Sequence, residues 1–247
     1  MPDSNFIIAI AAFAFVFAGF VKGVLGQGLP TVAVGILALV MSPGEATALL
    51  IFPALITNIW QAWFGPSLGM LLRRLWPVIA AICFGTWLGT VLGLGLLTPE
   101  TASLARKTLG AALILYGLLG LSRVRMAVPP RFQWWLGPLM GTVNGMVSVA
   151  TGVFMVPVIP YIQSLGFERD DMGQAQGISF TTSTAALSIV LITNGTMNVT
   201  NATGSLIAVP VTFMGMFLGQ YVRSFVHPEV FRILFFLLML EIGRAHV

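Results

Sequence analysis

The sequence predicts an all-α protein, a polytopic transmembrane bundle of about eight to ten spans built from two repeats. Of the 247 residues, 57% are hydrophobic and 8% are charged, whereas a soluble domain carries roughly a quarter charged residues. Charge-free runs such as 46–72 and 172–222 are longer than the ~20 residues that one helix needs to cross a bilayer. Glycine-rich segments at 19–30 and 141–152 lie at matching places in the two halves, and they predict broken or re-entrant first helices.

The expected helices follow the apolar blocks in chain order, because glycine, proline or charged residues separate one block from the next. In the first half these blocks lie at about 6–21, 29–41, 46–64, 76–97 and 108–121. In the second half they lie at about 134–144, 152–163, 172–193, 205–222 and 229–240. The two halves therefore carry matching series of blocks.

Short motifs also recur between the halves. The stretch GTWLG at 85–89 is matched by GMFLG at 215–219, and TPE at 98–100 is matched by HPE at 227–229. We interpret the GxxxG pairs as helix-packing faces. The duplication predicts a first transmembrane repeat at 1–121, a cytoplasmic linker at 122–133 and a second transmembrane repeat at 134–240. Residues 241–247 resemble translated sequencing adapter, so we expect a non-native tail there.

The basic residues predict the topology, because cytoplasmic loops are enriched in lysine and arginine. If each glycine-rich segment crosses the membrane twice, eight basic residues fall on one side (Lys22, Arg73, Arg74, Arg123, Arg125, Arg131, Arg169 and Arg223) and two on the other (Arg106 and Lys107). A single crossing gives five against four, so the double crossing is favoured. Its pieces of 12 or 13 residues rise only about 20 Å and predict half-helices or a re-entrant hairpin. An odd number of passes per half would place the repeats in opposite orientations.

Composition and motifs exclude several function classes. The formal net charge is +4, but the basic residues lie at span ends and in short loops, so no nucleic-acid partner is expected. Cys83 is the single cysteine, which leaves no disulfide or cysteine metal site within one chain. The sequence has no HExxH, GxSxG or Walker motif, so we expect no enzyme, no catalytic residue, no metal and no cofactor.

The first glycine-rich segment holds the main candidate site. Lys22 is its only ionisable residue and lies beside Gly23, Gly26, Gln27 and Gly28. Glycines let backbone N–H groups approach a ligand closely, and a buried cation beside helix ends suits an anion. A charge within the membrane costs ~3 kcal/mol or more, so an intramembrane lysine is a functional candidate. The alternative is a lysine that snorkels from a helix end to water.

The second glycine-rich segment places Asn144 at the position equivalent to Lys22, and Gly145, Ser148, Thr151 and Gly152 follow it. Amide, hydroxyl and backbone donors of this kind could also hold an anion. The alternative is helix packing by small residues whose hydroxyls bond back to their own helix.

Two further apolar helices carry amide side chains. Asn58 and Gln61 lie three residues apart in the first half, and Gln174 and Gln176 lie on the corresponding helix of the second half. They could line a polar pathway, or they could form interhelical hydrogen bonds that only hold the bundle together. We include Asn58 and Gln176 in the expected substrate-binding set.

These motifs resemble the sulfite exporter TauE/SafE family of membrane proteins, also described as the 4-toluene sulfonate uptake permease family. The resemblance rests on FVKG and GQGLPT within 20–31, NG and ATG within 144–152, PVIPY at 157–161 and QAQGISF at 174–180. It implies movement of small sulfur-containing or organic anions, such as sulfite and sulfonates, across the cytoplasmic membrane. Many members carry a longer glycine run where this chain has GQG at 26–28, and family descriptions usually count eight spans.

The leading hypothesis is a secondary transporter, expected to be an exporter, in the bacterial cytoplasmic membrane. The two glycine breaks would meet near the midplane, hold the anion through Lys22, Asn144 and backbone amides, and alternate access by rocking of the repeats. A passive anion channel is one alternative. A membrane-embedded sulfur-handling enzyme with Cys83 as nucleophile is another. The expected partners are a small anionic substrate and the lipid bilayer, and a homo-oligomer is left open.

Overall fold

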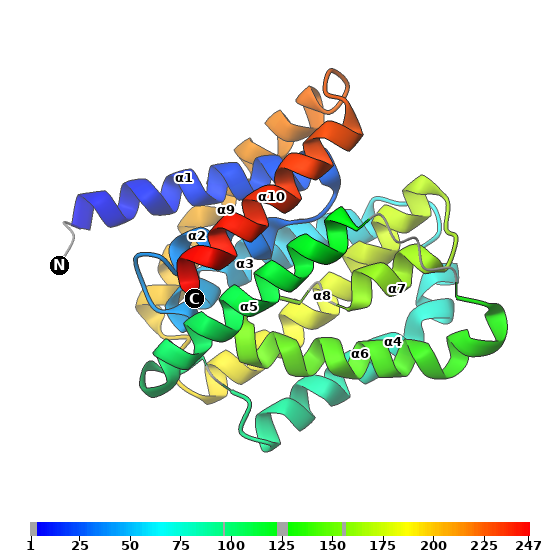
Figure 1. Cartoon of the computed structure of the whole chain (residues 1–247), viewed down its shortest axis with the longest axis horizontal. Helices are drawn as coiled ribbons and strands as arrows, with labels where there is room; N and C mark the ends of the chain where they lie inside the picture. The colour runs from blue at the N-terminus through cyan, green and yellow to red at the C-terminus, as the bar shows by residue number, and fades with distance from the viewer. Residues whose placement is uncertain (1–3, 96, 123–127, 155–156) are drawn as a thin grey trace.

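The computed structural model describes residues 4–95, 97–122, 128–154 and 157–247, and Figure 1 shows how its helices are arranged. These residues form helices and no strand, so the all-α prediction is confirmed. Part of the predicted linker (123–127, with Arg123 and Arg125) lies outside the described residues, as do residues 155–156 shortly after the second glycine-rich segment. The helices are α1 (Ser4–Leu25), α2 (Leu29–Leu37), α3 (Pro43–Trp63), α4 (Leu68–Val91), η1 (Pro99–Thr101), α5 (Ala102–Leu121), α6 (Pro130–Thr151), α7 (Val158–Ser164), α8 (Arg169–Thr193), α9 (Val199–Val222) and α10 (Pro228–His246).

Six helices in the described part of the chain are long and apolar enough to cross a membrane: α1, α3, α4, α5, α8 and α9. The protein is therefore a multi-pass membrane protein. Helices α2 and α7 have nine and seven residues, and at about 1.5 Å per residue neither crosses a bilayer alone. They lie where half-helices were expected, but the total of eight to ten spans, the re-entrant shape and the division at 122–133 stay predictions.

Each helix is interrupted only near the end of its glycine-rich segment, and not along the whole segment. Helix α1 continues through Gly19 and Gly23 to Leu25, and α6 continues through 141–145 to Thr151. The first break is at Gly26 (φ 75°) and Gly28 (φ 104°), and Gly152 (φ 73°) directly follows the last residue of α6. These left-handed backbone angles suit glycine, which has no side chain to clash there. Backbone conformation, and not glycine content, thus decides where each helix ends.

The helical glycines bring helices into close contact. A Cβ atom at Gly19 would lie 2.2 Å from the carbonyl oxygen of Thr212, and one at Gly215 would lie 2.0 Å from that of Val16. In the other crossing, a Cβ at Gly85 would lie 2.1 Å from the carbonyl oxygen of Thr142. The predicted packing role of the GxxxG pairs at 85–89 and 215–219 is confirmed, because only residues without side chains allow such an approach.

Each of these crossings joins one half of the chain to the other. Helix α1 packs along α9, α6 packs along α4, and α5 packs along α10. Helices α3 and α8 also pack against each other. Among the six apolar helices, these two have the largest share of their apolar segment buried inside the protein. Figure 1 shows the long helices running in roughly one direction, with the two chain termini toward the same end of the bundle. This arrangement places α3 and α8 where their polar side chains face protein.

Candidate functional site

The amine of Lys22 points into the bundle from the last turn of α1. Its nitrogen donates to the hydroxyl of Thr57 at 3.0 Å and to the side-chain oxygen of Asn58, both on α3. Only 4% of Lys22 is exposed. The structure thus brings together Lys22 and Asn58, two of the predicted site residues. This geometry differs from a snorkelling lysine, whose amine would reach water beyond the end of its helix.

A polar bridge continues from Asn58 into the second half of the chain. The side-chain nitrogen of Asn58 donates to the hydroxyl of Thr184 on α8 at 3.3 Å. The neighbouring Ser183 accepts a hydrogen bond of 3.1 Å from the side-chain nitrogen of Asn144 on α6. Lys22 and Asn144, which the sequence predicts to be equivalent, are therefore both linked to one turn of α8, Lys22 through Asn58 and Asn144 directly.

A cavity of about 710 Å³ opens from Lys22 toward the ends of α1, α3 and α9 and the start of α8. Five of the predicted site residues line it: Lys22, Gly23, Gly26, Gln27 and Gln176. The side-chain nitrogen of Gln176 donates to the side-chain oxygen of Gln27 at 3.4 Å, which links α8 to the break after α1. The aromatic residues Trp60 and Phe64 form part of the same wall.

Several cavity residues were not in the predicted site set. They are the amides Gln61, Gln163, Gln174 and Gln220, the hydroxyl of Thr57, and the charged side chains Asp170 and Arg223. The signal that could have found Gln220 is a polar residue directly after the packing motif at 215–219. Arg223 lies at a span end, where the sequence indicates its topology but not which cavity it faces.

The two glutamines Gln61 and Gln174 hold the cavity wall together. The side-chain nitrogen of Gln61 donates to the carbonyl oxygens of Gly26 at 3.0 Å and Gly173 at 2.8 Å. The side chain of Gln174 donates to the carbonyl oxygen of Ala62 at 2.7 Å and accepts from the backbone nitrogen of Ser67 at 2.9 Å. Gln61 thus supplies a donor to the first helix break, where a carbonyl group would otherwise lose its helical partner.

The remaining predicted residues do not line this cavity. Gly28 packs against Val21 and Phe235, and the second-half set is buried around Asn144: Gly145, Ser148, Thr151 and Gly152. Ser148 and Thr151 donate back to the carbonyl oxygens of Asn144 and Val147, at 2.7 and 2.8 Å. These bonds match the packing alternative for the hydroxyls. A binding role for this second-half set stays a prediction.

The side-chain oxygen of Asn144 is buried and has no hydrogen-bond partner among the described residues. Its side-chain nitrogen is bonded to Ser183, and none of Asn144 is exposed. A buried acceptor without a donor is unfavourable. In this conformation, the side-chain oxygen of Asn144 therefore lacks the hydrogen bond that a buried oxygen normally has.

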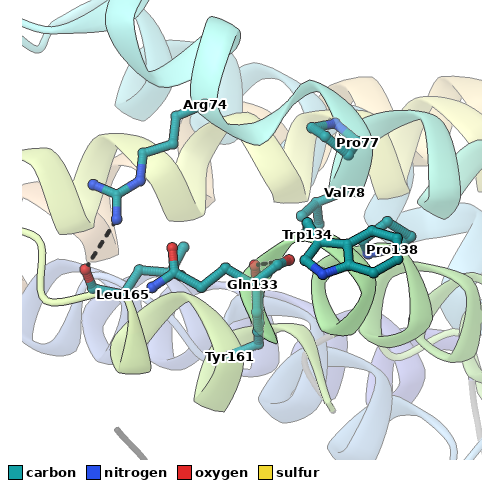
Figure 2. A pocket seen from close by; sticks show the side chains of 9 residues that line it. Arg74, Pro77, Val78, Gln133, Trp134, Pro138, Tyr161 and Leu165 are labelled. Carbon is teal, nitrogen blue, oxygen red and sulfur yellow. Dashed lines mark hydrogen bonds between the residues drawn. The ribbon is translucent and has the colours of Figure 1, made fainter. Parts of the chain in front are cut away.

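A second, smaller cavity of about 120 Å³ lies between α4, α6 and α7, and Figure 2 shows its lining. The guanidinium of Arg74 donates to the carbonyl oxygen of Leu165 at 3.3 Å. The hydroxyl of Tyr161 donates to the backbone carbonyl oxygen of Gln133 at 3.1 Å. None of the predicted site residues lines this cavity. Cys83 lies on the exposed surface of α4 and lines neither cavity.

Comparison with known proteins gives one match. A family model described as "Sulfite exporter TauE/SafE" matches residues 11–244, which is nearly the whole chain. No curated protein and no solved structure matches the chain.

Proposed function

Because the chain belongs to the sulfite exporter TauE/SafE family, whose members are membrane transporters, we propose that it exports small sulfur-containing or organic anions, such as sulfite and sulfonates, across the bacterial cytoplasmic membrane. One observation carries the choice of site: the buried amine of Lys22 stands at the inner end of the large cavity. The expectation that the protein is not an enzyme agrees with a transporter family, and the exposed position of Cys83 does not favour a nucleophile in the cavity.

The chemistry of the cavity suits an anion. Lys22 contributes the cation, while Gln27, Gln61 and Gln176 contribute neutral amides that can donate hydrogen bonds. A charge-assisted hydrogen bond is about twice as strong as a neutral one, and a low-dielectric site strengthens it further. Asp170 and Arg223 lie at exposed helix ends along the same cavity, so an anion would meet Arg223 before it reaches Lys22.

The buried polar side chains next to the cavity favour a transporter over a passive channel. Beyond Lys22 lie Asn58, Ser183, Thr184 and Asn144, which do not line the cavity and are each at most 2% exposed, and we call these four residues the barrier. They are joined by hydrogen bonds across α3, α6 and α8. An open channel needs a continuous path, whereas an alternating-access carrier exposes its site to one side at a time.

We further propose that the two halves are inverted repeats and that the barrier is the region which rearranges. The bond from Lys22 to Thr57 (3.0 Å) has a counterpart in the bond from Asn144 to Ser183 (3.1 Å). In an inverted-repeat carrier, the alternate state places the second half in the conformation of the first. The alternate cavity would then reach Asn144, with Gly145, Ser148, Thr151 and Gly152 around it.

The distribution of positive charge orients this proposal. Gln61 links the end of α1 to the start of α8, and Arg223 at the end of α9 lines the same cavity. This is the side that carries most of the basic residues in the double-crossing topology, so the positive-inside rule makes it cytoplasmic. The conformation described here would therefore accept an anion from the cytoplasm, as an exporter requires.

Sulfite flux in proteoliposomes tests the proposal. We expect saturable uptake that is accelerated by sulfite on the opposite side, and a decrease of at least about tenfold for Lys22→Met, because a hydrogen bond to a charged group is worth ~1.5–3 kcal/mol. Lys107→Met is the matched control, since Lys107 is exposed on α5 away from the cavity. Flux that is unchanged by Lys22→Met would reject this site, and flux without trans-stimulation would indicate a channel.

A further inference from the structure

We propose that Lys22 takes up a proton together with the anion, so that the protein moves the two as a pair. This inference rests on the proposed anion site and adds the coupling ion. The observation that carries it is a mismatch between the hydrogens on the amine and the acceptors around it. A protonated lysine has three N–H donors, and a neutral amine has two.

Among the described residues, two oxygen atoms accept hydrogen bonds from Lys22. They are the hydroxyl oxygen of Thr57, at 3.0 Å, and the side-chain oxygen of Asn58. Thr57 can only accept from the lysine, because its own hydrogen is donated to the carbonyl oxygen of Pro53 at 2.6 Å. Both hydrogens of a neutral amine are therefore satisfied by protein.

The orientation of Asn58 is fixed by a similar chain. Its side-chain nitrogen donates to the hydroxyl of Thr184 at 3.3 Å, and the hydrogen of Thr184 is donated to the carbonyl oxygen of Phe180 at 2.7 Å. Reversing the amide would turn its nitrogen toward Lys22 and its oxygen toward a hydroxyl that has no hydrogen to give. Asn58 thus presents an oxygen to the lysine.

A third hydrogen on Lys22 has no acceptor among the described residues, and Lys22 itself borders the cavity. An anion in that cavity would provide both an oxygen that accepts the third hydrogen and a charge that balances the ammonium. Without the anion, a buried ammonium among neutral partners is unfavourable because its lost hydration is not replaced. Anion and proton therefore stabilise each other in this site.

In the part of the chain that the structure describes, the surrounding helices supply no carboxylate bonded to Lys22. Helix α2 has no ionisable residue, and the carboxylate of Glu45 on α3 caps the start of its own helix at Ser42. The other ionisable side chains of the packed helices α8, α9 and α10, apart from Arg169, are Asp170, Asp171, Tyr221, Glu229, Arg232, Glu241, Arg244 and His246. Of these, Asp170 lines the cavity from an exposed position, as does Arg223 just after α9. The ion pairs Glu229–Arg232 and Glu241–Arg244, each at 3.1 Å, keep the charges of α10 in local contacts.

The transport step is then a balanced exchange of protons and charge. A proton from cytoplasmic water binds the nitrogen lone pair of Lys22 as a monovalent anion enters, and no covalent bond to the anion forms. The loaded site has the same net charge as the empty one. After the conformational change, the anion and the proton both leave to the other side, and the neutral amine returns. Transport of a monovalent anion would respond to a pH difference more than to membrane potential.

Proton uptake on binding tests this directly. Sulfite is added to the purified full-length protein in weak buffer, and protons are counted with a pH indicator for wild type and for Lys22→Arg, whose guanidinium stays charged. We expect wild type to take up about one more proton per bound sulfite than Lys22→Arg, because linkage ties anion binding to protonation. Sulfite's own titration cancels in the difference. Equal proton uptake by wild type and Lys22→Arg, when both bind sulfite, would overturn the proposal.

A second measurement needs no variant. Lys22 and Lys107 are the two lysines of the chain, and cyanate is a small reagent that reacts with neutral amines. At neutral pH we expect Lys22 to be carbamylated faster than the exposed Lys107, and sulfite to slow this reaction at Lys22 alone, as read by peptide mass spectrometry. Faster reaction at Lys107, with or without sulfite, would contradict a neutral Lys22.

The two proposals fail in different ways. If sulfite binds and is transported but no proton accompanies it, the anion site stands and the coupling is wrong. If wild type neither binds nor transports sulfite or a sulfonate, the proposed function fails and the coupling falls with it.

Discussion

The side-chain nitrogen of Asn58 donates to the hydroxyl of Thr184 at 3.3 Å, and this contact joins the two halves of the chain where the cavity ends. On its first-half side, Asn58 accepts from the amine of Lys22. On its second-half side, the residue before Thr184 accepts from Asn144 at 3.1 Å. One amide thus touches the candidate anion site and the barrier behind it, so substitutions here can separate binding from movement.

Replacing Asn58 should impair the anion site without unfolding the bundle. Asn58→Leu keeps the size of the side chain but removes the acceptor for Lys22 and the donor to Thr184. We expect sulfite affinity to fall about tenfold or more, because one charge-assisted hydrogen bond is worth ~1.5–3 kcal/mol. Sulfite binding by calorimetry measures this. Asn5→Leu, on the exposed start of α1, is the control and should bind as wild type does. Wild-type affinity in Asn58→Leu would exclude Asn58 from the site.

Replacing Asn144 should separate transport from binding. Asn144→Leu removes a buried oxygen that has no partner among the described residues, and Asn144 does not line the open cavity. We expect sulfite affinity at the cytoplasmic side to stay within about twofold, while exchange falls at least about tenfold, because the alternate state uses this residue. Equilibrium binding and counterflow on the same preparation decide between them. Undiminished exchange would remove Asn144 from the transport cycle.

The donor Gln61 should matter for the shape of the first break. Gln61→Leu leaves the carbonyl oxygens of Gly26 and Gly173 without their side-chain donor. We expect a loss of about 1 kcal/mol in stability or anion affinity, the typical net worth of a hydrogen bond, because these carbonyl groups are only half-buried. Thermal unfolding and sulfite binding separate the two effects. Gln133→Leu provides a comparison, since Gln133 lies at the smaller cavity. If both variants behave alike, the bridge made by Gln61 has no special role.

The close crossing of α1 and α9 should not tolerate side chains. Gly215→Ala places a methyl group 2.0 Å from the carbonyl oxygen of Val16, which forces the helices apart. We expect destabilisation of about 1–3 kcal/mol, as for other overpacked cores. Gly69→Ala is the matched control, because nothing lies within 4 Å of its added Cβ and alanine favours a helix. Thermal melting in detergent gives the comparison, and equal melting temperatures would show that the crossing can relax.

Cys83 offers a test of the enzyme alternative. It is exposed on α4 and lines neither of the two cavities described above. We expect Cys83→Ser to transport sulfite at the wild-type rate within about twofold, since an exposed cysteine outside the site contributes no binding contact. Loss of sulfite handling in this variant, with the protein still monodisperse, would revive a nucleophilic role for the thiol.

The sequence alone determined the helical membrane class and the family, because both follow from the order of residues along the chain. Long apolar runs must form helices in lipid to satisfy their backbone groups, and ordered motifs spread over the chain identify the family. The packing role of the glycines at 85–89 and 215–219 was also predictable, since the GxxxG spacing places both on one helix face. Lys22 stood out because a charge within an apolar run is costly.

Only the tertiary structure decided which of the polar residues share a site. It placed Lys22 beside Asn58 and opened a cavity toward Gln61, Gln220 and Arg223, while it buried Asn144 away from that cavity. It also moved the first break to 26–28, because helix geometry continued through the earlier glycines. The physical reason is that hydrogen-bond partners and cavities arise between helices distant in sequence, and the apolar pattern of one helix does not state which neighbour it will meet.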